Sequence, residues 1–173
     1  MLLFFTEQKA AANVIRAMSK VYSLKTVQKI PLSLELAWDF FSNPQNLATI
    51  TPDNMGFKTI SKHHGHTMYA GQVIEYKVSP LFGIPLYWMT EITHVADKKY
   101  FVDEQRYGPY SMWHHQHHFK VIEGGVEMTD IVHYKLPLWF LGDIANSFFV
   151  KKQLQQIFDY RFKKVEELFP NIK

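Results

Sequence analysis

The segment 101-FVDEQRYGPYSMWHHQHHF-119 contains two runs of alternating residues on either side of a Gly-Pro pair. Alternation with a period of two is typical of β-strands, and Gly108-Pro109 is typical of the turn between two strands. The segment therefore predicts a β-hairpin with strands over 99–106 and 110–122. Four of the nine histidines of the chain lie in the second strand, between positions 114 and 118.

Strand signals continue on both sides of this hairpin. The other candidate strands are 21–30, 55–62, 67–79, 84–96 and 126–136, and short turn-rich loops separate most of them. Such short connections favour an antiparallel meander.

Two short helices are expected between the first two strands. Ser33 can cap a helix over 34-LELAWDFF-41, in which the apolar positions fall on one side. Asn43-Pro44 ends that helix, and a second one is expected over 45–49.

The last part of the chain changes period. Apolar residues recur at intervals of three and four from Leu141 to Leu168, which predicts one long amphipathic helix. A sheet must bury one face, and this helix is the only predicted element long enough to cover it. The predicted fold class is α+β, a curved antiparallel sheet of about seven strands wrapped around the C-terminal helix. The gap between sheet and helix is the expected ligand site.

The composition restricts the kind of protein. With 47% apolar and 20% charged residues, the 173-residue chain is expected to form one globular domain over residues 18–173, preceded by an N-terminal extension over 1–17. The absence of cysteine excludes disulfides and thiolate sites, and fits a cytoplasmic location. A net charge of +3 without a dense basic stripe argues against a nucleic-acid partner.

The apolar segments of the chain are short. The apolar runs are far shorter than the roughly 20 residues of a membrane-spanning helix, so no stable membrane insertion is expected. A signal peptide is not expected, because no basic residue precedes the short apolar run at the first residues and no small-residue cleavage pattern follows it. Both a monomer and a homodimer remain open.

Strand parity divides the histidines of 110–122 into two pairs. Alternate residues of a strand face opposite sides, so His115 and His117 share a face with Trp113 and Phe119. That face is predicted to point inward because of its two bulky aromatic residues. His114 and His118 are then expected at the solvent face.

The turns predict the cross-strand partners of the inner histidines. A two-residue hairpin at Gly124-Gly125 pairs Glu123 with Val126, and carries Asp130 and Tyr134 to the inner face. In this register Phe119 lies opposite Asp130, His117 opposite Val132 and His115 opposite Tyr134. A three-residue turn over 107–109 places Asp103 opposite Trp113 and Phe101 opposite His115, whereas a two-residue turn would reverse the facing of Asp103 and Gln105.

Five segments together resemble the START-like (SRPBCC, helix-grip) superfamily, in particular its polyketide cyclase-like ligand-binding branch. They are 38-WDFFSNPQNLATITP-52, 71-GQVIEY-76, 101–119, 130-DIVHYKLP-137 and 157-IFDYR-161, and the resemblance spans residues 20–169. It implies a helix-grip fold with a deep, mostly apolar cavity for a small hydrophobic or amphipathic ligand. The FxDxQ pattern of the branch implies that Asp103 and Gln105 face inward.

The expected ligand-binding residues combine polar anchors with an apolar lining. The anchors are Asp103, Gln105, His115, His117 and Asp130, and the lining residues are Tyr76, Trp113, Phe119, Tyr134, Phe148 and Phe158. Arg161 is expected to form an ion pair with Asp159 or Glu91.

The inner histidines and carboxylates allow three interpretations. They can form a structural network, orient the polar end of a ligand, or act as a general base or metal site. No catalytic residue is assigned, although His115, His117 and Asp130 are candidates. No metal and no cofactor are expected, since the HxH strand lacks the spacing and the second motif of metal-binding cupins.

The favoured function is therefore binding of a small hydrophobic molecule without catalysis. The alternative is a polyketide cyclase- or dehydratase-like enzyme in which a His–Asp pair acts as general base.

Overall fold

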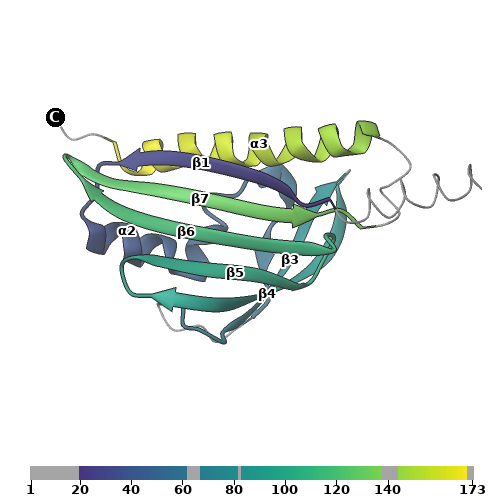
Figure 1. Cartoon of the computed structure of the whole chain (residues 1–173), viewed down its shortest axis with the longest axis horizontal. Coiled ribbons are helices and arrows are strands. Elements are labelled where there is room, and N and C mark those ends of the chain that lie inside the picture. The colour runs from purple at the N-terminus through teal and green to yellow at the C-terminus, as the bar shows by residue number, and fades with distance from the viewer. Residues whose placement is uncertain (1–19, 62–66, 82, 138–143, 171–173) are drawn as a thin grey trace, which may run out of the picture.

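The computed structural model describes residues 20–61, 67–81, 83–137 and 144–170 (Figure 1). Its elements are β1 (Tyr22–Ile30), α2 (Leu34–Phe41), the 3₁₀ helices η1 (Pro44–Leu47) and η2 (Asp53–Met55), β2 (Lys58–Thr59), β3 (Val73–Leu81), β4 (Ile84–Ala96), β5 (Tyr100–Tyr107), β6 (Met112–Ile122), β7 (Gly125–Lys135) and α3 (Ile144–Leu168). The N-terminal extension over 1–17 lies outside the described residues.

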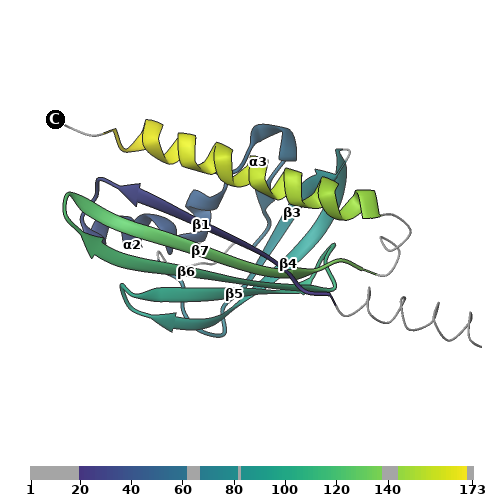
Figure 2. The same cartoon turned by 45° about the horizontal axis from the view of Figure 1, so that its top comes forward.

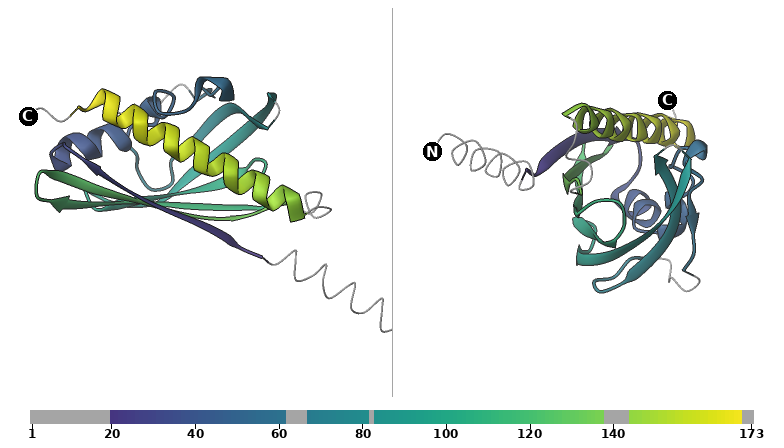
Figure 3. Two further views of the ribbon diagram at one scale, coloured as in Figure 1. Left: turned by 90° about the horizontal axis from the view of Figure 1, so that it is seen from above. Right: turned by 90° about the vertical axis from the view of Figure 1, so that its right-hand side faces the viewer.

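The strands form one antiparallel seven-stranded sheet in the order β1-β7-β6-β5-β4-β3-β2. Strands β2 to β7 follow one another as the predicted meander, and β1 pairs with β7 at the end. The sheet curves strongly, and α3 runs along its open side (Figures 2 and 3). Register shifts between Ile92 and His94 and between Val78 and Leu81 interrupt the pairing, and such bulges bend a sheet. The predicted α+β fold class is confirmed.

Helix α2 covers one end of the concave face of the sheet. The Ser33 hydroxyl accepts a hydrogen bond from the Leu36 backbone N–H at 3.3 Å and so caps the helix, as the sequence predicts. Trp38 is 2% exposed and meets the rings of Phe101 and Phe119 edge-on, at centroid distances of 6.0 and 5.4 Å. These contacts anchor the helix to the start of β5 and the last third of β6.

Helix α3 packs its apolar stripe on the far end of the sheet. Val150, Leu154 and Phe158 form a buried cluster with Val132 and Tyr134 of β7. Among the described residues no helix combines the length and the hydropathy that a membrane crossing needs.

Three predicted elements differ in extent. The strand expected over 55–62 is reduced to Lys58–Thr59, because Asp53–Met55 form η2, which ends in Gly56 with a φ of +52°. The strand expected over 67–79 begins only at Val73. The second short helix is a 3₁₀ helix over Pro44–Leu47 instead of 45–49.

The predicted register of the β6–β7 hairpin is wrong by two residues. Ile122 pairs with Gly125, so the turn is Glu123-Gly124 rather than Gly124-Gly125. Gly124 has a φ of +79°, which the second central residue of a type II turn requires. A shift of two residues preserves which face each side chain points to. It changes the cross-strand partners, however, and places His117 directly opposite Asp130.

The β5–β6 pairing is shifted in the same way. Asp103 lies opposite His115 instead of Trp113, and Phe101 lies opposite His117. The predicted turn over 107–109 therefore moves toward Tyr110. Both register errors leave the inner face of β6 as predicted and bring its two histidines closer to the carboxylates than the sequence indicated.

Replacement of Gly125 by Ala should destabilise the protein by roughly 2–3 kcal/mol, at the upper end of ordinary single substitutions. An added Cβ would lie 2.1 Å from the backbone oxygen of Ile30, so β1 or β7 would have to move. Gly124→Ala is the matched control, because its Cβ meets nothing within 4 Å. That variant should lose only the roughly 1–2 kcal/mol of a left-handed backbone conformation. Equal losses in urea-induced unfolding would contradict the close approach of β1 to the turn.

Candidate functional site

A cavity of about 160 Å³ lies between the concave face of the sheet, η1 and α3. Most of its wall is aromatic or aliphatic, including Tyr76, Trp88, Trp113, Leu154 and Phe158. The aspartate, histidine and arginine side chains that line it are Asp103, His115, His117 and Arg161. The wall is thus mostly apolar, with one region of acidic and basic side chains.

Asp103, His115, His117 and Asp130 form a compact group that we call the His–Asp cluster. The two imidazoles alternate on β6, with Asp103 beside them on β5 and Asp130 beside them on β7. Nε2 of His117 lies 2.9 Å from Oδ2 of Asp103, and Nε2 of His115 lies 2.9 Å from Oδ1 of Asp130. Both contacts have hydrogen-bond geometry.

The other ring nitrogens complete the group. Nδ1 of His115 lies 3.4 Å from Oδ2 of Asp103, and Nδ1 of His117 lies 2.8 Å from Oδ1 of Asp130. The second contact is short but lies outside hydrogen-bond geometry, so we treat it as an electrostatic contact. Each imidazole therefore spans both carboxylates.

Aromatic packing fixes the orientation of the two imidazoles. Phe101 stacks on His117 at a centroid distance of 4.1 Å and an interplanar angle of 20°. The His115 and His117 rings are 3.8 Å apart, and Phe158 of α3 meets His115 edge-on at 5.9 Å. The rings have little freedom to rotate, since both side chains are more than nine-tenths buried.

Burial and pairing act in opposite directions on the carboxylates. Burial alone would raise the pKa of Asp130, but hydrogen bonds and charge from His115 and His117 hold that pKa well below its usual range. Burial also acts to raise the pKa of Asp103, and the two imidazoles with Arg161 outweigh it, so that the pKa is lowered. Both acids are therefore ionised at neutral pH.

The two imidazoles differ from each other. Burial lowers the pKa of His115, and the neighbouring His117 adds to this effect. Burial also acts to lower the pKa of His117, but the hydrogen bond to Asp103 and the close contact with Asp130 outweigh burial, so the pKa of His117 is raised. His117 is thus the more basic of the two.

Arg161 of α3 brings a further positive charge to the cavity. Its side chain is 9% exposed, and the guanidinium carbon lies 5.0 Å from the centre of the Phe158 ring. The predicted ion pair with Asp159 or Glu91 is wrong, because Glu91 pairs with Arg106 at 2.6 Å and Asp159 accepts a hydrogen bond from Gln155. Arg161 instead faces inward, since position 161 falls on the apolar stripe of the helix.

Gln105 braces the β5–β6 loop rather than the cavity. Its side-chain amide donates to the Tyr110 carbonyl at 2.7 Å, and its carbonyl accepts from the Tyr110 backbone N–H at 3.3 Å. A Cβ on Gly108 would lie 2.4 Å from the Gln105 oxygen, so glycine leaves room for this pair of hydrogen bonds, which we call the Gln105 bracket. The Gln105 bracket positions Tyr110 at the cavity wall, where its ring packs on Trp113 at a centroid distance of 5.0 Å.

The remaining predicted ligand-binding residues divide into two groups. Tyr76, Trp113 and Phe158 line the cavity as expected. Phe119 is instead buried under Trp38, Tyr134 stacks on Tyr22 at 5.5 Å, and Asp130 lies behind the imidazoles, so these three are absent from the cavity wall. The side chain of Phe148 lies outside the described part of the structure.

Most of the other cavity residues were not predicted from the sequence, among them Trp88, Tyr110 and Arg161. The signal for Arg161 was present, because it follows Leu154 and Phe158 at helical spacing on a buried face. Trp88 depends on the bulged pairing of β4, and Tyr110 depends on the Gln105 bracket. Neither feature has a periodic pattern.

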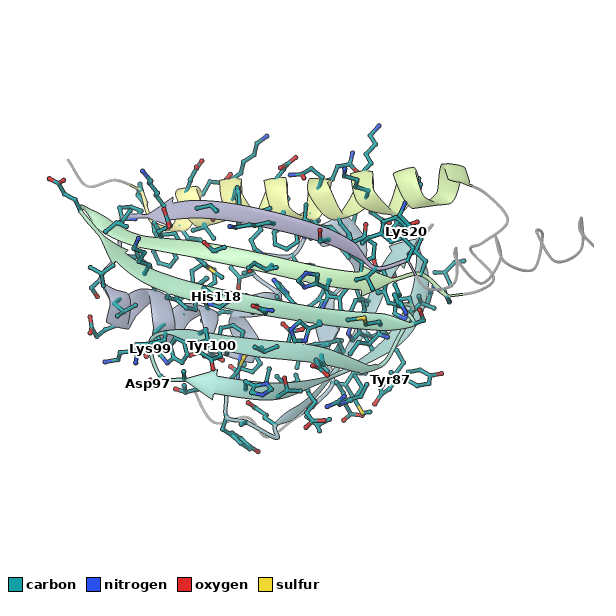
Figure 4. The ribbon with its side chains drawn as sticks, in the orientation of Figure 1. Lys20, Tyr87, Asp97, Lys99, Tyr100 and His118 are labelled. Carbon is teal, nitrogen blue, oxygen red and sulfur yellow. The ribbon has the colours of Figure 1, made fainter. Side chains whose placement is uncertain are left out.

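His114 and His118 lie on the other face of β6, as predicted. His114 contacts Glu104 at 2.9 Å, and His118 contacts Gln116 at 2.9 Å. Figure 4 labels His118 beside Tyr100 on the neighbouring strand, and their rings are 5.6 Å apart. This outer polar row has no contact with the cavity.

Among the described residues, the group of donors that could hold a metal ion is Asp103, His115 and His117. Each offers one ligand atom, and these atoms all lie within 4.8 Å of one another. Imidazole nitrogens with one carboxylate oxygen form a common ligand set for first-row transition metals.

Comparisons with known proteins give matches in structure only. No protein-family model matches the sequence, and no curated protein does. The protein Ms6760 from Mycobacterium smegmatis is 14% identical, with 87% of this chain and 96% of that chain aligned at a TM-score of 0.62. Major latex-like protein 151 from ginseng (Panax ginseng) is 15% identical, with 87% and 98% aligned at a TM-score of 0.63.

Identities this low establish the fold alone. Together with the curved seven-stranded sheet closed by α3, they show that the chain has the helix-grip fold. The chemistry of the cavity must be argued from its own residues.

Replacement of Asp130 by Ala should destabilise the protein by roughly 3–5 kcal/mol, as expected when one partner of a buried charged group is removed. The substitution leaves His115 Nε2 and His117 Nδ1 buried without their carboxylate partner, so that only Asp103 still contacts the two imidazoles. Glu127→Ala on the same strand is the matched control, because Glu127 lies on the outer face of β7 and should change stability by roughly 0.5 kcal/mol or less. Urea-induced unfolding measures both, and a loss of similar size in the two variants would contradict a tightly paired cluster.

Proposed function

We propose that this protein binds a small amphipathic molecule whose apolar body fills the cavity and whose anionic head pairs with Arg161. The observation that carries the proposal is Arg161 itself, a nine-tenths buried cation on the wall of a mostly apolar cavity. No carboxylate of the described residues forms an ion pair with it.

The size and lining of the cavity define the body of the ligand. A cavity of about 150 Å³ lined by aliphatic and aromatic side chains holds benzene in another protein. The cavity here is about 160 Å³ and presents Trp88, Tyr110 and Trp113. A molecule with one ring or an equivalent branched chain therefore fits it.

The charge of Arg161 defines the head. A buried guanidinium is unfavourable unless it is paired and hydrogen-bonded. Its Nε has no hydrogen-bond partner among the described residues, and the Phe158 ring supplies only a cation–π contact. Because a guanidinium matches a carboxylate in a bidentate manner, a carboxylate head is the natural partner.

The contacts of the imidazoles favour binding over general-base catalysis. A general base must present a free nitrogen to its substrate. In the His–Asp cluster all four ring nitrogens lie within 3.4 Å of a carboxylate oxygen. The cyclase-like alternative would need an imidazole nitrogen away from these carboxylates, and neither His115 nor His117 presents one.

Benzoate and benzamide test the proposal, since they share a ring but differ in charge. Benzoate should bind more tightly than benzamide in calorimetric or NMR titrations, and Arg161→Gln should weaken benzoate binding about tenfold or more, the equivalent of 1.4 kcal/mol or more. The affinity for benzamide should hardly change in this variant.

Arg106→Gln is the matched control, because Arg106 is exposed and pairs with Glu91 on the outer surface. It should leave benzoate binding unchanged. Equal binding of both compounds, or an equal loss in the two arginine variants, would refute the anionic head. Failure of both compounds to bind would refute the cavity as a site for ligands of this size.

A further inference from the structure

The His–Asp cluster has the geometry of a metal site with a second-shell carboxylate. Asp103 on β5 and His115 and His117 on β6 point their donor atoms to one place on the cavity wall. All three side chains come from central strands of the sheet rather than from loops. Ligands on such rigid elements keep their positions when the ion leaves or enters.

We propose that Asp103, His115 and His117 bind a divalent first-row transition-metal ion through Oδ2, Nδ1 and Nε2, respectively. Bonds of about 2.0–2.1 Å to nitrogen and oxygen place neighbouring ligands roughly 2.9–3.4 Å apart in octahedral or tetrahedral geometry. Asp103 Oδ2 lies 2.9 Å from His117 Nε2 and 3.4 Å from His115 Nδ1. Both separations from Asp103 Oδ2 therefore match neighbouring ligands of one bound ion, and all three donors lie within 4.8 Å of one another.

The number of hydrogens in the cluster also favours a cation. A neutral imidazole carries one N–H, so it donates to only one carboxylate. When His115 donates from Nε2 to Asp130, its Nδ1 lone pair faces Asp103 Oδ2 at 3.4 Å with no hydrogen between them. A metal ion between these atoms converts their repulsion into coordination.

Asp130 occupies the place of a second-shell orienting group. Metal-binding histidines usually donate their other N–H to a carboxylate or carbonyl, which fixes the tautomer. Oδ1 of Asp130 is hydrogen-bonded to His115 Nε2 at 2.9 Å and lies 2.8 Å from His117 Nδ1 without hydrogen-bond geometry. Asp130 would thus fix the tautomer of His115 and add an electrostatic contact to His117.

The ligand set selects the class of ion. Imidazole favours Zn²⁺, Fe²⁺, Co²⁺ and related ions over Mg²⁺ and Ca²⁺, which prefer oxygen ligands. Three protein ligands leave coordination positions open, and the three side chains line the cavity. The open positions therefore face the space that the proposed ligand would occupy.

Co²⁺ and Zn²⁺ test the inference on the untagged, chelator-treated full chain. Co²⁺ should bind in one equivalent with visible d–d absorption, and Zn²⁺ should displace it. No organic ligand is present in this titration, so its failure is distinguishable from failure of the proposed anion binding. Absence of stoichiometric Co²⁺ and Zn²⁺ binding would overturn the metal site.

Variants of the two faces of β6 locate the ion. Asp103→Asn and His117→Gln should each weaken Co²⁺ binding more than 100-fold, while Asp130→Asn should weaken it about 10–100-fold, as for other second-shell carboxylates. His114→Gln and His118→Gln, on the outer face of the same strand, should bind Co²⁺ as the original protein does. Full binding by the Asp103 and His117 variants would place the ion elsewhere and overturn the proposal.

The NMR spectrum of the unsubstituted protein gives the same answer if the ligand variants do not fold. Zn²⁺ should shift the ¹⁵N resonances of Nδ1 in His115 and Nε2 in His117. The hydrogen should then be on Nε2 in His115 and on Nδ1 in His117. Zinc-induced shifts at any other pair of ring nitrogens would overturn the assignment.

Discussion

The structure depends on keeping ionised side chains in the middle of a buried sheet face. Two carboxylates and two imidazoles lie there, and they are tolerated only because β5, β6 and β7 place them in an alternating arrangement across three strands. A slip of one residue in any of these three strands would turn its aspartate or histidines to the outer face. The charged groups on the neighbouring strands would then be buried without a partner. The cluster therefore specifies the register of the central strands at the same time as it makes the cavity wall polar.

The segment 101–119 is best understood as a set of supports for this arrangement. Phe101 stacks on His117, Asp103 contacts both imidazoles, and Gln105 fixes the loop that brings Tyr110 to the cavity. Gly108 leaves room for the Gln105 side chain. The residues of the segment 101–119 thus support one another by direct contact. The segment pairs two strands, fixes the loop between them and lines the cavity.

Periodicity was sufficient to predict the fold and most of the facing of side chains. The alternation of β6 placed His115 and His117 inside, and the helical spacing of the C-terminal segment identified α3. The cross-strand partners were wrong by two residues because both hairpin turns were placed incorrectly, and turn geometry depends on local φ angles that no periodic pattern encodes. The shift matters, since it decides whether His117 lies opposite an aspartate or a valine.

Other parts of the site depend on contacts between distant segments. Phe119 and Tyr134 lie on the predicted face of the sheet, but residues of α2 and β1 pack on them and bury them in the core. Asp159 or Glu91 was the predicted ion-pair partner of Arg161, yet helical spacing turns Arg161 toward the cavity. The sequence indicates on which face a residue lies. Whether that residue lines the cavity or packs against another element depends on the three-dimensional packing.

The aromatic residues of the cavity wall have an optical consequence. Trp88 meets Trp113 at 5.4 Å and Tyr110 at 5.6 Å, so two indoles and a phenol are close enough to exchange excitation energy. Trp38 is buried beneath α2 and absent from the cavity wall. The protein thus contains fluorophores in contact with any occupant and another indole shielded from it, which together form a built-in reporter and its internal reference.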